Sequence, residues 1–238
     1  MATEQQTPSA GELLGRRTQD DRALVIKILA YVKTFSKRKP LGAIGGFIIL
    51  IMIGLAVFAP IIANDPMEWN LRDKFQGPSL QYWLGTNDVG QDLWAQIVYG
   101  AQISLYVGVM SVIYGSGIGG VVGLVSAYYG GKTDVIIQRI MDAMMAIPTL
   151  VLALAIMAAL GGSVNNVVIA IGAVQIPRAN RIVRSQALSV RESEFALAAR
   201  SIGATDMRIM FQHIMPQCVA PFLIIATAAL GTAIISEA

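Results

Sequence analysis

The chain contains very little cysteine, histidine and charge. Its single cysteine, Cys218, cannot form a disulfide within the chain, and its single histidine, His213, has no cluster of further metal ligands, so a structural or interface role is expected for it. Charged residues make up 14% of the sequence and hydrophobic residues 55%, far from the balance of a soluble domain. No catalytic constellation is present. The composition therefore predicts a membrane protein without a metal, a cofactor or a catalytic site.

Two short motifs resemble nucleotide-binding loops but lack the context that such loops need. Gly115, Gly117 and Gly120 have the spacing of a dinucleotide fingerprint, yet they lie inside an apolar run with no strand before it. Residues 131–133 resemble the end of a phosphate-binding loop, but Ser126 occupies the place of its first glycine. We therefore predict no nucleotide site, and any ATP must be hydrolysed by another polypeptide. The net charge of +3 indicates orientation in a membrane rather than nucleic-acid binding.

Long apolar runs predict five membrane-spanning helices of roughly 20 residues or more. They cover residues 41–63, 103–129, 135–160, 164–185 and 217–238. A basic cluster at residues 37–39 precedes the first run and six arginines follow the start of the fourth, which places the N-terminus and loop 186–216 in the cytoplasm and loop 64–102 outside. Residues 1–40 are interpreted as a cytoplasmic tail with a basic segment, without the apolar core of a signal peptide. The prediction is an all-α multi-pass protein of the plasma membrane.

Small and polar residues within these runs suggest more specific roles. Gly115, Gly119 and Gly123 recur every fourth residue, which predicts close packing against a neighbouring helix. Polar groups in a span are costly unless a neighbour or a water-filled cavity satisfies them. Three residues are candidates for a pathway or gate, and Pro148 is also expected to bend its helix: Gln175, Pro148 and Asn166. Asp142 is predicted to pair with Arg139, three residues earlier on the same helix.

The cytoplasmic loop has the pattern of two short helices joined at a glycine. Ser189 and Glu192 have capping-box spacing, so the first helix is expected to begin near Val190. Gly203 occupies the position of a left-handed C-cap. Thr205 then predicts the cap of a second helix. Its expected apolar face consists of Met207, Met210, Phe211 and Ile214, and Pro216 would open the next span.

This loop resembles the EAA loop of bacterial ABC-importer permeases, in the branch that imports di- and oligopeptides or nickel. Ala198, Ala199, Gly203 and Pro216 carry the resemblance, whereas Leu197 replaces the usual glutamate. Residues 194–216 would then contact an ATPase subunit. The residues expected in this coupling loop are Glu194, Phe195, Ala198, Ala199, Arg200, Gly203, Ala204, His213 and Pro216.

A second block, residues 82–92, is similar to the LGTD…GRD stretch in the first external loop of peptide permeases. Here Asn87 and Gln91 stand where the family more often has aspartate and arginine. Residues 130–134 and 139–148 also match the family's pattern, so the likeness extends over most of the chain from Lys39 onward.

The resemblance implies the type I ABC-importer transmembrane fold, with permease domain 41–238 and a sixth span expected beyond Ala238. Such a subunit forms half of a pathway for short peptides in the lipid bilayer. Its partners would be a second permease subunit, two cytoplasmic ATPase subunits and an external solute-binding protein. The alternatives are an importer of nickel or another small solute, a secondary transporter, and a membrane scaffold without a pathway.

Overall fold

The computed structural model describes residues 33–237, so most of the predicted tail 1–40 lies outside the described residues. The chain divides into two units, residues 1–54 and 55–238. Residues 33–38 are helical, and helix α2 (Pro40–Ile62) begins in the first unit and ends in the second. Helix α2 is uncharged and mostly exposed, and only Ala56 and Ala59 are buried. A helix whose exposed surface is uncharged and apolar is suited to contact with lipid.

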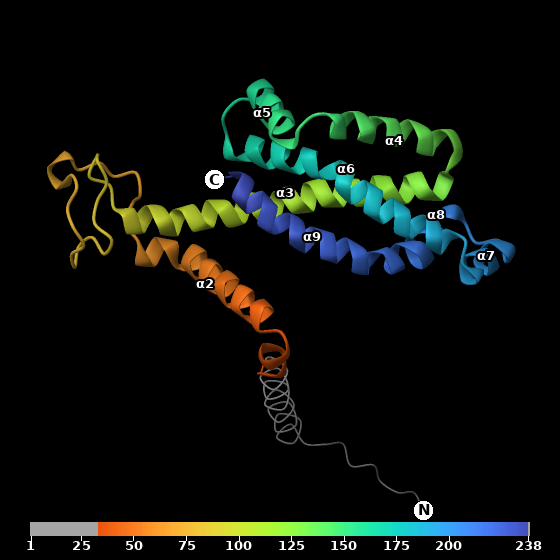
Figure 1. Ribbon diagram of the computed structural model, residues 1–238, viewed down its shortest axis with the longest axis horizontal. Helices are drawn as coiled ribbons and strands as arrows, with labels where there is room; N and C mark the ends of the chain where they lie inside the picture. Colours follow the sequence, from red (N-terminus) through yellow and green to blue (C-terminus); the bar gives the residue numbers. More distant parts are fainter. Residues whose placement is uncertain (1–32, 238) are drawn as a thin grey trace, which may run out of the picture. The chain divides into compact units, whose positions relative to one another are not determined.

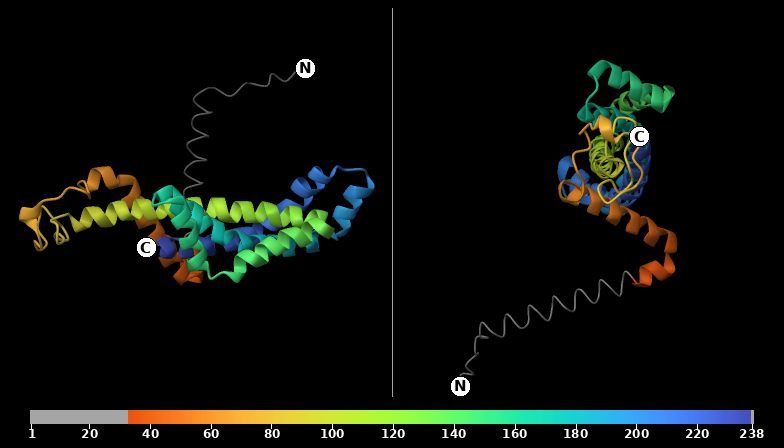
Figure 2. Two further views of the ribbon diagram at one scale, coloured as in Figure 1. Left: turned by 90° about the horizontal axis from the view of Figure 1, so that it is seen from above. Right: turned by 90° about the vertical axis from the view of Figure 1, so that its left-hand side faces the viewer.

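The second unit is built from helices, and the all-α prediction is confirmed. The short helix η1 (Leu71–Asp73) precedes α3 (Leu93–Tyr129), α4 (Gly131–Ala146), α5 (Thr149–Leu160) and α6 (Val164–Arg191). They are followed by α7 (Glu194–Ser201), α8 (Asp206–Arg208), the π-helical turn η2 (Ile209–Ile214) and α9 (Met215–Glu237). Helices α3, α6 and α9 lie side by side, and α4 and α5 flank α6 (Figures 1 and 2).

Three helical segments in the described part of the chain are long and apolar enough to cross a membrane: Pro40–Ile62, Leu93–Tyr129 and Asp206–Glu237. The bent pair α4 and α5 makes a fourth if it counts as one span. Helix α6 contains the predicted fourth span, but Arg178, Arg181, Arg184 and Arg191 interrupt its apolar character. The five-span arrangement therefore stays a prediction.

The predicted third span, 135–160, is not one straight helix. Helices α4 and α5 meet at 95°, and the break falls at Ile147 and Pro148. Because proline disfavours helical backbone in the residue before it, Ile147 adopts an extended conformation with φ −91° and ψ 131°. The bend expected from Pro148 is present and is sharper than a kink within one helix.

The glycine stripe of α3 lies against the backbone of α6. A Cβ atom at Gly115 would clash with the Gly172 carbonyl, and one at Gly119 with the Ile176 carbonyl. A Cβ at Gly123 would lie 2.5 Å from the carbonyl oxygen of Asn180. Successive contacts four residues apart on both helices mean that the two backbones run close together over several turns. Glycine is needed at these positions because no side chain fits between the helices.

Candidate functional site

Helix α7 is short, exposed and sharply terminated. Its end is a Schellman motif, in which Ala204 N–H donates to the Ala199 carbonyl at 3.1 Å and Gly203 N–H to the Arg200 carbonyl at 3.0 Å. Gly203 has φ +81°, the left-handed conformation expected from its position. Ala196 and Ala199 face the core, whereas Phe195, Leu197 and Ile202 are exposed. The helix therefore presents apolar side chains on its outer face.

The start of α7 differs from the sequence prediction. Helix α6 continues through Val190 to Arg191, and α7 begins only at Glu194 after the cap residue Ser193. The capping-box assignment at Ser189 was wrong because Ala187 and Val190 are buried in a core shared with Tyr128 and Met210. Tertiary packing of these side chains prolongs α6 past the local stop signal.

The second half of the loop merges into α9 through a π-helical turn. Met215 N–H donates to the Met210 carbonyl, five residues earlier, directly before Pro216. Because the proline ring would clash with the carbonyl four residues back, a wider turn at this point relieves the crowding. Met210 and Ile214 are buried as predicted, but Met207 and Phe211 are exposed and Ile209 lies in the core instead. Thr205 is the N-cap residue of α8 as predicted, although its side chain makes no cap hydrogen bond.

A hollow opens between α7 and the α8–η2 segment. Its lining consists of Phe195, Ala198, Ala199, Ile202, Gly203, Ala204, Arg208 and His213. Six of these are residues that the sequence had selected, while Ile202 and Arg208 were missed. Glu194, Arg200 and Pro216 are exposed outside the lining. Small residues form much of the wall, which leaves room for a side chain from another protein.

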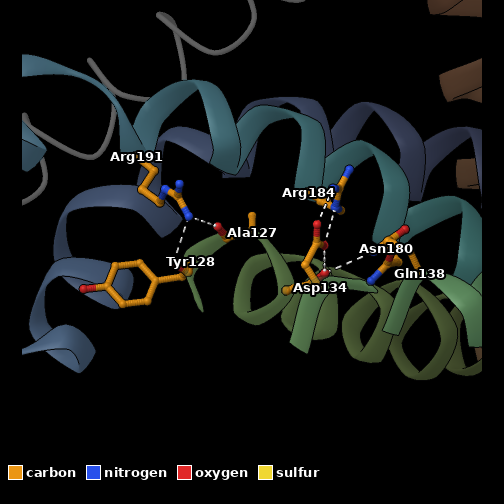
Figure 3. Close-up of polar contacts among 8 residues, drawn as sticks. Ala127, Tyr128, Asp134, Gln138, Asn180, Arg184 and Arg191 are labelled. Carbon is orange, nitrogen blue, oxygen red and sulfur yellow. Dashed lines mark hydrogen bonds and ion pairs between the residues drawn. The ribbon is translucent and has the colours of Figure 1, made fainter. Parts of the chain in front are cut away.

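Tyr128, at the end of α3, contacts this loop through both its hydroxyl and its ring. Its hydroxyl donates a 2.6 Å hydrogen bond to the Asp206 carboxylate, and the Arg200 guanidinium lies 5.8 Å from the centre of its ring. Arg191 donates to the carbonyls of Ala127 and Tyr128 at 2.8 and 3.1 Å (Figure 3). These carbonyls belong to the last turn of α3, where a cation is favourable. No sequence pattern had singled out Tyr128.

A polar cluster ties α4 to α6 at the same end of the unit. Asp134 accepts two hydrogen bonds from Arg184, at 2.5 and 2.6 Å, and one from Ser126 (Figure 3). Gln138 donates to Ser126 Oγ and to the fully buried Asn180, both at 3.1 Å. Charge-assisted and bidentate hydrogen bonds of this kind are stronger than hydrogen bonds between neutral groups.

Asp142 does not pair with Arg139 as predicted. It accepts a 2.6 Å hydrogen bond from Arg181 of α6, and both side chains are about half exposed. The correction has a simple physical reason, since α4 and α6 pack against each other and bring the arginine from 39 positions away. Asp142 therefore pairs with Arg181 across the two helices and not with Arg139 on its own helix.

The family described as binding-protein-dependent transport system inner membrane component matches residues 119–238, which include the loop and its hollow. The chain belongs to this family. Residues 36–78 match the N-terminal membrane domain of oligopeptide transport permease C.

Curated relatives of this permease align over most of its length. A dipeptide transport system permease protein of Alkalihalophilus pseudofirmus is 43% identical over 203 residues, covering 85% of this chain and 67% of the relative. A putative peptide transport system permease protein of Brucella suis is 42% identical over 196 residues, 82% and 66% of the two chains. A glutathione transport system permease protein of Shigella flexneri is 41% identical, covering 85% and 67%. The permease thus spans about two thirds of the length of these relatives.

The block before α3 in this permease is held by side-chain amides and a buried aspartate. Asn87 Oδ1 accepts from the backbone of Val89 and Gln91 at 3.0 and 2.9 Å, and its amide donates to Gln91 Oε1 at 2.8 Å. Asp92 caps α3 by accepting from Trp94 N–H at 2.9 Å. A neutral amide pair therefore occupies positions 87 and 91. Nearby, a hydrogen bond to Asp73 raises the pKa of the half-buried Tyr82 phenol.

The pairing predicts that positions 87 and 91 tolerate change only together. Asn87→Asp alone removes the amide donor from Gln91 and adds a charge beside Asp88 and Asp92, so a lower melting temperature is expected. The double change Asn87→Asp with Gln91→Arg restores a donor and an opposite charge, and it should melt within a few degrees of the parent. Thermal unfolding in detergent measures both. Equal losses in the single and double variants would contradict the pairing.

The three pathway candidates have distinct surroundings in the permease. The Gln175 Oε1 atom is buried on α6 and accepts no hydrogen bond from the described residues. Pro148 is the cap residue at the bend between α4 and α5. The amide of Asn166 donates to the carbonyls of Leu160 and Gly161, both at 2.9 Å, so it closes the turn after α5.

Proposed function

We propose that this chain is one permease subunit of an ATP-driven importer of short peptides, and that it forms half of the translocation pathway. Its proposed partners are a second permease subunit, two cytoplasmic ATPase subunits and an external solute-binding protein. The observation that carries the proposal is the hollow beside α7, with exposed apolar side chains around it. An exposed apolar patch of this kind marks a protein contact.

The proposed occupant of the hollow is the ATPase subunit. Phe195 and Ile202, 47% and 85% exposed, would contact the partner, while Ala198 and Gly203 leave room for its side chains. The Schellman end gives α7 a fixed length and direction, and the rigid turn can pass on a push from the partner. Movement of α7 would then tilt the helices that continue from the loop, which is alternating access driven by ATP.

The distribution of basic residues supports a cytoplasmic position for this loop and for the N-terminal side of α2. Arg191, Arg200 and Arg208 lie in or beside the loop, and residues 37–39 precede α2. Lysine and arginine concentrate on the cytoplasmic side of membrane proteins. We therefore place both segments inside the cell and residues 64–92 outside.

The pathway itself would run along α6 and the bend between α4 and α5. A buried polar atom without a partner is costly unless it meets water or a solute. The Gln175 side chain on α6 has such a buried oxygen without a partner, which water or a solute in a pathway would satisfy. Pro148 forms the bend, so both residues are proposed to line or gate the pathway. Asn166 is proposed to shape the outer turn, because both of its donated bonds go to backbone carbonyls.

Short peptides are the proposed cargo because the relatives are named for dipeptide, peptide and glutathione transport. The test is uptake of labelled dipeptide into cells that lack their own importers but carry the permease, its sister subunit, ATPases and binding protein. Nickel serves as the parallel cargo. Peptide uptake supports the assignment, and uptake of nickel alone would move the cargo to metal.

Gly203→Val is expected to remove the ATPase subunit from the purified complex. Valine is strained at φ +81°, so the Schellman end of α7 and the hollow should both be lost. Gly161→Val is the matched control, because Gly161 also follows a helix end, has φ +87° and has open space around it. Co-purification of the ATPase measures the effect. Equal ATPase recovery with both variants would contradict docking at the hollow.

A further inference from the structure

Three elements of the coupling loop converge on one residue of α3. The Tyr128 hydroxyl holds Asp206 at the start of α8, its ring lies beneath Arg200 of α7, and its carbonyl accepts from Arg191 at the end of α6. Tyr128 is only 5% exposed and belongs to the same buried core as Ala199 and Met210. A buried phenol whose hydroxyl reaches a carboxylate at 2.6 Å makes a charge-assisted bond.

The chain itself joins the loop to α6 and α9 but not to α3. Helix α6 leads into α7 through Glu192 and Ser193, and α8 continues through the π-helical turn into α9. Helix α3 ends at Tyr129, its cap residue Gly130 has φ +64°, and the chain then turns into α4. Contacts between elements must therefore carry any movement of the loop to α3. Beside the packing of α3 on α6, the polar contacts that join α3 to α7 and α8 among the described residues are those of Tyr128.

Helix α3 is well placed to receive such a movement. It is one continuous helix of 37 residues, and its cap residue Asp92 belongs to the block that we place outside the cell. At 1.5 Å per residue it is about 55 Å long, more than the thickness of a bilayer core. At its other end Trp94 stacks near Trp83 and Leu93 N–H donates to the Gly85 carbonyl. A rigid helix of this length connects the coupling loop with the outer block.

We propose that Tyr128 is a positioning residue that ties α7 and α8 to the end of α3, so that displacement of the coupling loop moves α3 together with α6 and α9. This inference rests on the proposed function of the loop. Tyr128→Phe removes the hydroxyl bond to Asp206 and keeps the ring beneath Arg200.

The experiment compares Tyr128→Phe with Tyr129→Phe in the complete importer in proteoliposomes. Tyr129 is the adjacent tyrosine, is exposed, and makes a ring-edge contact with Tyr128 that phenylalanine retains. The measured quantity is labelled dipeptide taken up per ATP hydrolysed. Tyr128→Phe should lower this ratio roughly tenfold, in line with one hydrogen bond to a charged group, and Tyr129→Phe should leave it unchanged. A fall in uptake and hydrolysis by the same factor would indicate structural damage only and would overturn the proposal.

Asp206→Ala tests the same hydrogen bond by removing its acceptor. If the bond between the two side chains is what matters, Asp206→Ala should lower the ratio as much as Tyr128→Phe, and the double variant should lose no more than either. Losses that multiply would overturn the proposal.

A distance measurement separates this inference from the proposed function. Spin labels at Ile202→Cys and Val121→Cys, in a Cys218→Ala background, report the separation of the loop and α3 in the purified permease. Both labelled side chains are exposed. A broader distance distribution with Tyr128→Phe, but not with Tyr129→Phe, supports the tie whatever the cargo proves to be. Identical distributions would overturn it even if the importer works, whereas absent uptake by the parent importer would count against the proposed function alone.

Discussion

Gly119→Val is expected to prevent stable packing of α3 against α6. A Cβ atom at this position would clash with the carbonyl of Ile176 and lie 2.9 Å from the Cβ of Ala179 and 3.1 Å from the backbone nitrogen of Asn180. Backbone atoms cannot swing aside as a flexible side chain does, so the helices would have to separate over several turns. Overpacking a core typically costs 1 to 3 kcal/mol, and here we expect a loss above about 3 kcal/mol because the obstacle is the backbone.

Gly117→Val is the matched control for this prediction. Gly117 lies on the same helix two residues away, but beyond its own turn of helix nothing lies within 4 Å of the position of its Cβ. Fluorescence-detected size exclusion in detergent, followed by thermal unfolding, compares the yield and stability of the two proteins. The Gly119 variant should be recovered mostly as aggregate and the Gly117 variant as the parent peak. Equal recovery would show that α3 and α6 do not pack as described.

The spacing of the α3 glycines could be recognised from sequence because it is local. Residues four apart lie on one helical face, and small residues at that spacing allow close helix contact. The identity of the partner helix could not be recognised in the same way. Gly115 faces Gly172, nearly sixty positions later, and no local pattern encodes so distant a pairing. The sequence therefore predicted which face of α3 packs closely, but not that α6 is the helix against which it packs.

The loop shows where local rules are overridden. The left-handed Gly203 was predictable because the helix end and its cap are set by adjacent residues. The start of α7 was not, because burial of Ala187 and Val190 extends α6 past a good capping sequence. The π-helical turn before Pro216 was also missed, although the proline gives a physical reason for it.

Tyr128 illustrates why a residue with long-range contacts could not be recognised from the sequence alone. Its partners Arg191 and Asp206 lie 63 and 78 positions away in the chain, and each contact depends on how α3, α6 and α8 meet. Taken alone, a pair of tyrosines before two glycines looks like the end of a membrane helix. Asp142 shows the same limit, because a neighbour three residues away was a reasonable partner until α6 brought Arg181 closer.

Asp134→Asn is expected to destabilise the permease by about 2 kcal/mol, which for a chain of this size lowers the melting temperature by roughly 5 °C. Asparagine has nearly the shape of aspartate, so no cavity forms, but one of the two bonds from Arg184 loses its acceptor. The Arg184 and Asp134 side chains are only 29% and 17% exposed, so water cannot fully replace the lost carboxylate. An uncompensated charge in such a site costs more than the intact pair contributes.

Asp142→Asn provides an internal comparison, since Asp142 is on the same helix and also pairs with an arginine of α6. That pair is about half exposed and has one contact, and surface pairs contribute little, so a change within about 0.5 kcal/mol is expected. Combining Asp134→Asn with Arg184→Gln removes the unpaired charge and should recover part of the loss, which a double-mutant cycle quantifies. If Asp134→Asn and Asp142→Asn melted at the same temperature, the link between α4 and α6 would not depend on the partly buried pair. If only Asp134→Asn melted earlier, that pair would be what holds α4 against α6 beside the coupling loop.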